Sequence, residues 1–248
     1  MSTHLYCVMT SSDADVLPAG LLGVNDAPVH AVPVDDLVAW VSEIDRNSAI
    51  TIGGVKAHDA VVQAAVDAGA TPVPARYGQR FADDSAARDA IGRRSSAIRA
   101  LLESLQGFVE MTLLLTPSTS RMIKDLQPVV PEMVDTEQGA GRRYLDSLRA
   151  REAATGTLRR TLDALAGLLA DAVQRVARRV SVRDDLARLP MRTVSHLVAR
   201  ASVDEYRASL AAVRAPADSR FLVIGPRAPY SFSTLAPDDG VHGMRIAD

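Results

Sequence analysis

Histidine and cysteine, the residues that most often bind metals or carry acid–base chemistry, are few and scattered in this 248-residue sequence. His4 and Cys7 are three positions apart, a spacing that metal ligands can have. Both lie in the alternating segment "HLYCVM", and residues three apart on a strand face opposite sides of the sheet. Because no further ligands accompany them in the sequence, we interpret both as structural residues and predict no metal site.

His58 and His196 are the other histidines that catalysis could use, one in a helical pattern and one in an alternating pattern. Neither has a nucleophile or a carboxylate pattern near it in the sequence, so a structural role is favoured for both. We therefore predict no catalytic residue and no enzymatic activity. Residues distant in sequence can still meet in a fold, so a small-molecule-binding or enzymatic α+β protein stays the alternative.

Acidic pairs and a glycine pair are the remaining candidates for chemistry. "GGVK" (53–56) lacks the spacing and the Gly-Lys-Ser/Thr ending of a phosphate-binding loop, so it reads as the entry to a helix and predicts no cofactor. The acidic pairs stand at the ends of expected elements, where helix capping and solvation explain them. These pairs are Asp35–Asp36, Asp83–Asp84, Asp184–Asp185 and Asp238–Asp239.

Arginine is the one charged residue type that is clustered in the sequence, between residues 142 and 183. Few acidic residues accompany it, so this face is either simply solvated or docks onto an acidic protein surface. RNA is a weaker partner, because no interleaved aromatic residues provide stacking platforms. The candidate partner-binding arginines are Arg142, Arg149, Arg159 and Arg160.

Composition limits the other partners. The net charge of −2 creates no field that attracts nucleic acid or membranes, and the apolar fraction of 47% is normal for a globular protein. A single cysteine fits a reducing compartment. The N-terminus has no signal-peptide pattern, and no apolar run approaches the roughly 18 residues of a membrane span. These features predict an intracellular protein.

The first half of the chain predicts a small α+β domain, residues 1–105. Two helices are expected there, and the segment between them is extended and interrupted by prolines. Pro33 lacks a donor for a sheet ladder, so it is expected either in an edge strand or at the end of a strand. The expected strands are 4–9, 28–34 and 36–44, the last two forming a hairpin, and the expected helices are 55–69 and 83–105.

The second half predicts a ferredoxin-like domain, residues 106–248, with a modified βαββαβ order and a tail at 226–248. The clearest strand is 108–116, followed by a loop at 117–138. A long helix is expected over 141–179, with a break near Thr155–Gly156 and with Leu145, Leu148, Leu158, Leu162 and Leu165 facing the core. Further elements are a possible strand within 181–189, strands at 191–202 and 220–225, and a helix at 203–213.

The segment "FLVIGPRAPYSF" (221–232) gathers scarce aromatic residues beyond the last strand. Gly225 and Pro226 are expected to end that strand. Tyr230 and Phe232 then fold back onto the domain. They either close an exposed end of the core or form an apolar patch that receives a partner, and both readings make them candidates.

Three segments resemble the GvpF/GvpL family of gas vesicle proteins. They are "VPARYGQRF" (73–81), "GRRYLDSLRAR" (141–151), which looks like the family's Gly-x-x-Tyr-Leu helix start, and "FLVIGPRAPYSF". The last resembles the family's Gly-Pro-Trp-Pro-Pro-Tyr-Ser-Phe ending, with Arg227–Ala228 standing where the family commonly has Trp-Pro. The segments fall in the family's order, so the resemblance covers nearly the whole chain.

The resemblance implies a two-domain α+β assembly factor, a minor component of the gas vesicle. Family members are thought to bind the shell protein GvpA, limit its aggregation and assist nucleation of the vesicle. The implied partners are GvpA and other gas vesicle accessory proteins. The implied location is the gas vesicle, a cytoplasmic organelle, and the cytoplasm. The family brings no cofactor and no catalytic residue.

Overall fold

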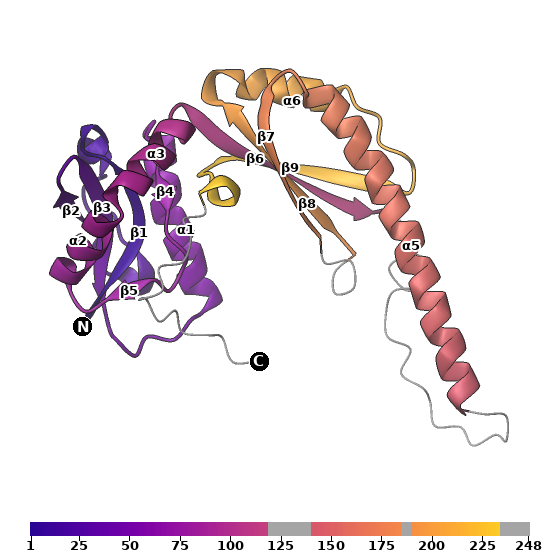
Figure 1. The fold of residues 1–248 in the computed structure, drawn as a ribbon, viewed down its shortest axis with the longest axis horizontal. Coiled ribbons are helices and arrows are strands. Elements are labelled where there is room, and N and C mark those ends of the chain that lie inside the picture. Colours follow the sequence, from indigo (N-terminus) through magenta and orange to yellow (C-terminus); the bar gives the residue numbers. More distant parts are fainter. Residues whose placement is uncertain (119–139, 185–189, 234–248) are drawn as a thin grey trace. The chain divides into compact units, whose positions relative to one another are not determined.

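The computed structural model describes residues 1–118, 140–184 and 190–233 (Figure 1). Contacts between residues divide the chain into two units. The first unit contains residues 1–110 and the chain from residue 226 onward, and the second contains residues 111–225. This grouping differs from the division expected from chain order, in which residues 226–248 follow the second domain. That each unit folds independently remains a prediction.

The sheet of the first unit has the strand order β2-β3-β1-β4, with β5 also pairing with β1. β1 lies inside the sheet, and its residues from Ser2 to Met9 are all buried. Trp40 of β3 is fully buried, so the largest aromatic ring of the chain anchors this core. The strands are β1 (Ser2–Thr10), β2 (His30–Val34), β3 (Leu37–Ile44), β4 (Val73–Pro74) and β5 (Arg80–Phe81).

The predicted hairpin is present between β2 and β3, which pair antiparallel with Val34 opposite Leu37. Asp35 has a φ of 54°, which the tight turn requires. The strand β2 is at the edge of the sheet, which is one of the two positions expected from Pro33.

Three helices accompany this sheet: α1 (Ile52–Asp67), α2 (Asp84–Arg93) and α3 (Ser95–Leu105). α1 begins three residues before its predicted start, because the Thr51 hydroxyl accepts a hydrogen bond from the Gly54 amide at 3.0 Å and caps the helix there. The single helix expected over 83–105 is instead two, interrupted at Arg94, whose φ and ψ are −109° and 7°. The expected cap is present, since Asp83 accepts from the Ala86 amide.

The second unit has the predicted ferredoxin-like plan. Its sheet has the order β7-β8-β6-β9, and two helices connect the outer and inner strands. β6 begins within the first unit and β9 ends within it. The elements are β6 (Phe108–Pro117), α5 (Ala140–Val173), β7 (Ala177–Asp184), β8 (Arg192–Ala199), α6 (Val203–Ala211) and β9 (Ser219–Arg227). Short 3₁₀ turns are η1 (Ser11–Val16), η2 (Val24–Asp26), η3 (Arg200–Ser202) and η4 (Tyr230–Phe232). Most of the loop expected at 117–138 is outside the described residues.

α5 corrects two predictions about the long helix. It continues through Thr155–Gly156 without a break, and it ends at Val173 because β7 begins at Ala177. Its 34 residues span about 51 Å.

The expected core stripe holds only for the second half of α5. Leu158, Leu162 and Leu165 are fully buried, whereas Leu145 and Leu148 are 53% and 42% exposed. Around the helix, Leu148 lies only about 20° beyond the buried Val173, so its exposure comes from its place along the axis, in the half of α5 that extends past the sheet (Figure 1). Leu145, three residues earlier, lies further round still.

β9 corrects the expected end of the last strand. The strand continues through Gly225 and Pro226 to Arg227. Gly225 accommodates a φ of 127°, and Pro226 is tolerated because β9 is an edge strand that needs no donor there. The extra residues carry the chain into the first unit.

Candidate functional site

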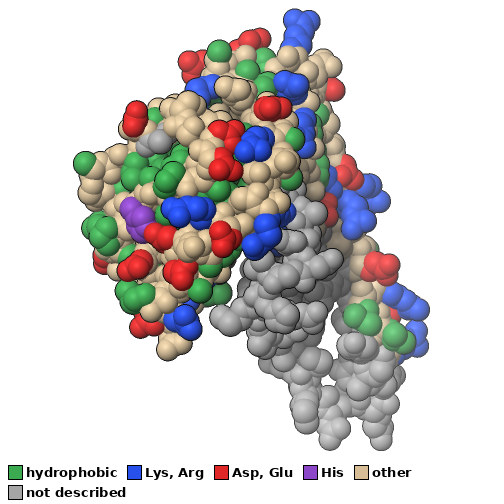
Figure 2. Space-filling model, turned by 60° about the vertical axis from the view of Figure 1, so that its left-hand side comes forward, with side chains coloured by type: hydrophobic (Ala, Val, Ile, Leu, Met, Phe, Trp, Pro, Cys, Tyr) green, Lys and Arg blue, Asp and Glu red, His purple; other side chains and the backbone are tan. Residues whose placement is uncertain are grey.

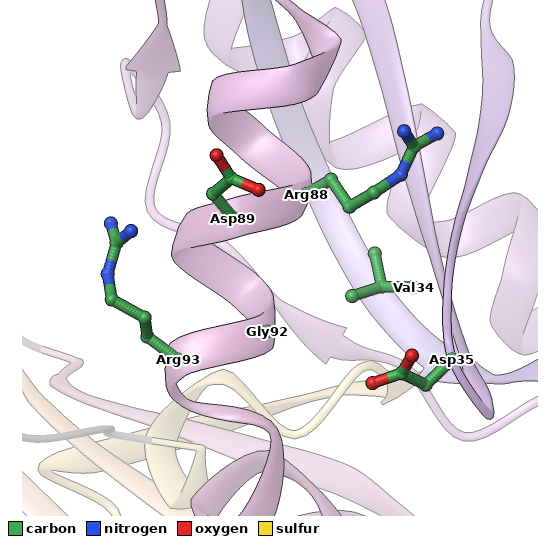
Figure 3. A pocket seen from close by; sticks show the side chains of 6 residues that line it. All are labelled: Val34, Asp35, Arg88, Asp89, Gly92 and Arg93. Atoms are coloured by element: carbon green, nitrogen blue, oxygen red, sulfur yellow. The ribbon is translucent and has the colours of Figure 1, made fainter.

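A shallow pocket of about 340 Å³ lies between the β2–β3 turn and α2 in the first unit (Figure 3). Val34 and Asp35 point toward α2 from the turn, and Gly92 leaves the helix backbone open to them. The Arg88 Nε donates a hydrogen bond to the Pro33 carbonyl at 3.1 Å. The lining residues are Val34, Asp35, Arg88, Asp89, Gly92 and Arg93.

This lining can bind a small polar ligand through its two arginines and two aspartates. It contains no histidine, cysteine or hydroxyl nucleophile. Charged side chains of both signs are also interspersed over the face of the first unit that Figure 2 shows. The pocket therefore offers polar recognition and no pairing of nucleophile with base.

The most concentrated polar chemistry of the first unit is buried. The Nε2 of His4, on β1, is 2.9 Å from the Nδ1 of His58, on α1. The Nε2 of His58 is 3.1 Å from the Ala75 carbonyl, which can only accept, so this nitrogen carries the proton. The Nδ1 of His58 therefore accepts from the Nε2 of His4, and both rings are neutral.

Aromatic rings surround this pair: Tyr6 and Tyr77 lie with ring centroids 4.8 Å and 5.6 Å from that of His4. Burial lowers the pKa of His4 to about 3, with smaller contributions from His58 and Arg80, and burial also lowers the pKa of His58. Neutral, fully packed rings suit a structural role, as the sequence predicted for each histidine alone. The sequence did not predict their meeting, and the only signal was that both lie on buried faces.

Cys7 and His196 are buried separately from that cluster. Burial raises the pKa of the Cys7 thiol, which makes it a poor nucleophile. The Nδ1 of His196 lies 2.8 Å from the Tyr206 hydroxyl, and burial lowers its pKa to about 4. Across the described residues, no three His, Cys, Asp or Glu side chains are grouped to hold a metal ion.

The aromatic candidates Tyr230 and Phe232 lie in η4, on the first unit. Phe232 is buried, and the Tyr230 hydroxyl is buried without a hydrogen-bond partner among the described residues. Polar contacts hold the chain where this segment begins. Arg227 forms an ion pair with Asp59, and the Gln63 Nε2 donates to the Pro226 carbonyl at 3.2 Å.

Glu110 fixes the centre of the same segment. Its buried carboxylate accepts from the backbone amide and the hydroxyl of Ser231. The segment from Arg227 to Ser233 is therefore a strap fastened to the first unit, and we use that name for it below. From the sequence we expected these rings to pack on the second domain, because the sequence does not show that β9 extends into the first unit.

The candidate arginines Arg142, Arg149, Arg159 and Arg160 all lie on α5 and are all exposed. Arg149 forms an ion pair with Asp146 at 3.3 Å, and Arg160 donates to the Thr157 hydroxyl at 3.2 Å. Helical geometry places Arg142, Arg149 and Arg160 within about 40° of one another, on the side opposite the buried leucines. Arg159 is rotated by about 80–100° from this stripe.

No helix within the described ranges has the length and apolar character needed to cross a membrane. Among curated proteins, none matches the chain. The crystal structure of gas vesicle protein GvpF from Microcystis aeruginosa matches with a TM-score of 0.69 at 18% identity, over 94% of this chain and 99% of that one. GvpF from Anabaena sp. PCC7120 matches with a TM-score of 0.68 at 14% identity, over 95% and 99%.

At these identities the solved structures establish the fold, the two-sheet α+β architecture described above. The sequence itself carries the stronger assignment. The family model described as gas vesicle synthesis protein GvpL/GvpF matches residues 2–234, nearly the whole chain. The chain therefore belongs to the GvpL/GvpF family of gas vesicle synthesis proteins.

Proposed function

We propose that this protein is a non-enzymatic assembly factor that binds the shell protein GvpA, limits its aggregation and assists nucleation of the vesicle. The observation that carries the proposal is the family match over residues 2–234. A shell subunit that encloses gas needs an apolar gas-facing side, which aggregates in water unless it is covered before polymerisation. A stoichiometric binder supplies such a cover, and its place of action is the cytoplasm and the growing vesicle.

The exposed stripe of α5 supports a docking role for Arg142, Arg149 and Arg160, with Arg159 beside it. Exposed charges mainly set the association rate and the salt dependence of binding. We propose that these arginines attract acidic groups on GvpA or on another gas vesicle protein. Tyr230 and Phe232 contribute indirectly in this view, by holding the strap on the first unit.

A ligand-binding or enzymatic role is the alternative, and the pocket beside α2 is where it would be found. Its mixed charges suit a small polar molecule. Substitution Arg93→Ala in this pocket separates the two functions, because protection of GvpA does not require the pocket in our proposal.

Light scattering by GvpA, measured at rising ratios of the protein, tests the assembly-factor proposal. We expect aggregation to fall in proportion to added protein, to saturate at a fixed ratio and to be the same without ATP. The charge-reversed variant Arg149→Glu/Arg159→Glu should protect less well. A requirement for ATP, or saturation far below one protein per GvpA oligomer, contradicts the proposal. Unchanged protection by Arg93→Ala is the matched control.

A further inference from the structure

β7 is an edge strand of the second unit, and its surface is unusual for an edge. Among the described residues it pairs only with β8, so it stands at one end of the strand order β7-β8-β6-β9. Its other six residues are ordinary for a solvated edge, but Val180 and Val182 are 57% and 56% exposed. An edge strand with exposed apolar side chains invites pairing with another strand.

The register between β7 and β8 shows which face these valines occupy. Val180 is opposite His196 and Val182 is opposite Val194, and directly opposite residues lie on the same face of a sheet. His196 bonds Tyr206 of α6, so this is the face that the helices cover. The two valines therefore lie at the margin of the core, where the helices stop covering the sheet.

α5 passes beside this margin with small side chains. Asp163 of α5 pairs with Arg192, which also donates to Asp184 of β7 at 2.9 Å and 3.1 Å. Ala166 and Ala170 follow Asp163 by three and seven residues, so they lie on the same side of α5. Alanine side chains are short, which is compatible with apolar side chains of an added strand beside the valines.

The opposite face of β7 is basic. Arg179 and Arg183 alternate with Ser181 on the face away from the helices, and both arginines are exposed. Asp184, the last residue of β7, is engaged by Arg192. A second copy of β7, paired antiparallel about Ser181, would set Arg179 opposite Arg183, and like charges directly opposite are unfavourable. Charge thus favours an acidic partner over a second copy.

We propose that the outer edge of β7 binds an extended acidic segment of a partner protein, which joins the sheet as an additional strand. The partner's apolar side chains lie beside Val180 and Val182, and its carboxylates lie beside Arg179 and Arg183. Main-chain hydrogen bonds supply affinity in this mode of recognition, and alternating side chains supply specificity. The proposal concerns a different surface from the arginine stripe of α5 and does not require the partner to be GvpA.

A synthetic peptide tests this surface on the full chain. The probe is fluorescein-labelled Thr-Glu-Val-Thr-Val-Glu-Thr, whose symmetric core places valines and glutamates correctly in either strand direction. Fluorescence anisotropy should show saturable binding that weakens as salt is added. A second peptide with lysine in place of glutamate keeps the apolar pattern and should bind at least about tenfold more weakly.

Matched variants locate the binding edge. Val180→Asp and Val182→Asp should each weaken binding of the glutamate peptide by about tenfold or more. Leu222→Asp is the control, because Leu222 is also 57% exposed and lies on β9, the opposite edge of the same sheet. Arg183→Glu should weaken the glutamate peptide and strengthen the lysine peptide. This exchange keeps the test decisive even if a valine variant fails to fold.

Several results overturn the proposal. One is the absence of glutamate-peptide binding up to about 1 mM. If the lysine peptide binds as tightly as the glutamate peptide, the partner need not be acidic. If Leu222→Asp weakens binding as much as the valine variants do, the peptide does not bind specifically at β7. A wild-type dimer in analytical ultracentrifugation that Val180→Asp abolishes would assign the edge to a second copy of the chain instead.

Discussion

The carboxylate of Glu110 accepts two hydrogen bonds from Ser231, one from the backbone amide at 2.7 Å and one from the hydroxyl at 2.9 Å. These residues are 121 positions apart in sequence, so the pair closes the strap onto the first unit through a very distant contact. A carboxylate that receives such bonds while buried stabilises the fold strongly, since hydrogen bonds to charged groups contribute about 1.5–3 kcal/mol each.

Substitution Glu110→Gln keeps the size of the side chain and removes its charge and one acceptor. We expect the free energy of unfolding to fall by about 1–3 kcal/mol and the strap to become more sensitive to proteases. Urea unfolding followed by circular dichroism, together with limited proteolysis, measures both. Glu43→Gln, at an exposed carboxylate of β3, is the control and should change stability by less than about 0.5 kcal/mol. Equal effects of the two variants would remove the special role of Glu110.

Gly54 and Gly53 are neighbours in the first turn of α1 that should respond oppositely to alanine. A Cβ at Gly54 would overlap the hydroxyl of Tyr77, whereas a Cβ at Gly53 meets nothing closer than the Thr51 hydroxyl at 3.9 Å. We expect Gly54→Ala to destabilise the protein by about 1–3 kcal/mol through overpacking. Gly53→Ala should be neutral or stabilising by up to about 1 kcal/mol. Thermal unfolding of both variants tests this, and comparable stability of the two would show that Tyr77 moves aside freely.

The buried histidines should make the protein sensitive to mild acid. In the folded chain the pKa of His196 falls to about 4 because of burial, and that of His4 to about 3, below the ordinary value of 6.5. Between these values the unfolded chain binds more protons than the folded chain, so the free energy of unfolding decreases as the pH falls below 6.5. Each histidine contributes a slope of up to about 1.4 kcal/mol per pH unit.

His196→Asn isolates one of these contributions. An asparagine oxygen or nitrogen can stand near the position of Nδ1 and bond the Tyr206 hydroxyl, but it does not titrate. We expect the variant to lose less stability than the wild type between pH 7 and pH 5, by about 1 kcal/mol or more. Urea midpoints at the two pH values give the comparison. An unchanged pH dependence would mean that His196 is not buried neutral in the folded chain.

Charge reversal on α5 should separate binding from folding. Arg149→Glu/Arg159→Glu removes two exposed charges that are outside the buried stripe, so stability should change by less than about 0.5 kcal/mol per site. Binding to GvpA or another gas vesicle protein should weaken, most strongly at low salt. Sedimentation or pull-down at two salt concentrations measures the effect. If binding at low salt is unchanged, this face is only solvated, and if the variant unfolds, the buried stripe has been assigned wrongly.

Much of the fold was predictable because local pattern and burial agree. Alternation predicted the hairpin of β2 and β3, and the edge position of β2 is one of the two that Pro33 allowed. The βαββαβ order followed from the sequence of elements in the second half, and the sheet order β7-β8-β6-β9 bears it out. In each case, residues close in sequence belong to one strand or one helix. A hydrophobic period of two or 3.6 residues is then enough to predict that element.

The errors arise where a residue's environment depends on a segment that is distant in sequence. Leu145 and Leu148 repeat at helical spacing, yet they lie in the half of α5 that extends past the sheet (Figure 1). The candidate arginines remain a proposal for the same reason, because a partner surface leaves no mark on spacing. Glu110 and Ser231 could not be paired from sequence, since nothing in either segment identifies the other. The meeting of His4 and His58 was hidden in the same way.

The division of the chain has a consequence for its synthesis. The strap completes the first unit, but residues 111–225 lie between that unit's main part and the strap. At about 5–20 residues per second, a ribosome needs roughly 6–23 s to translate this insert. During that interval the nascent first unit lacks Phe232, and the Glu110 carboxylate has no hydrogen bonds from Ser231. Closure of the first unit is therefore a late event in the life of each newly made chain, timed by the translation of the second.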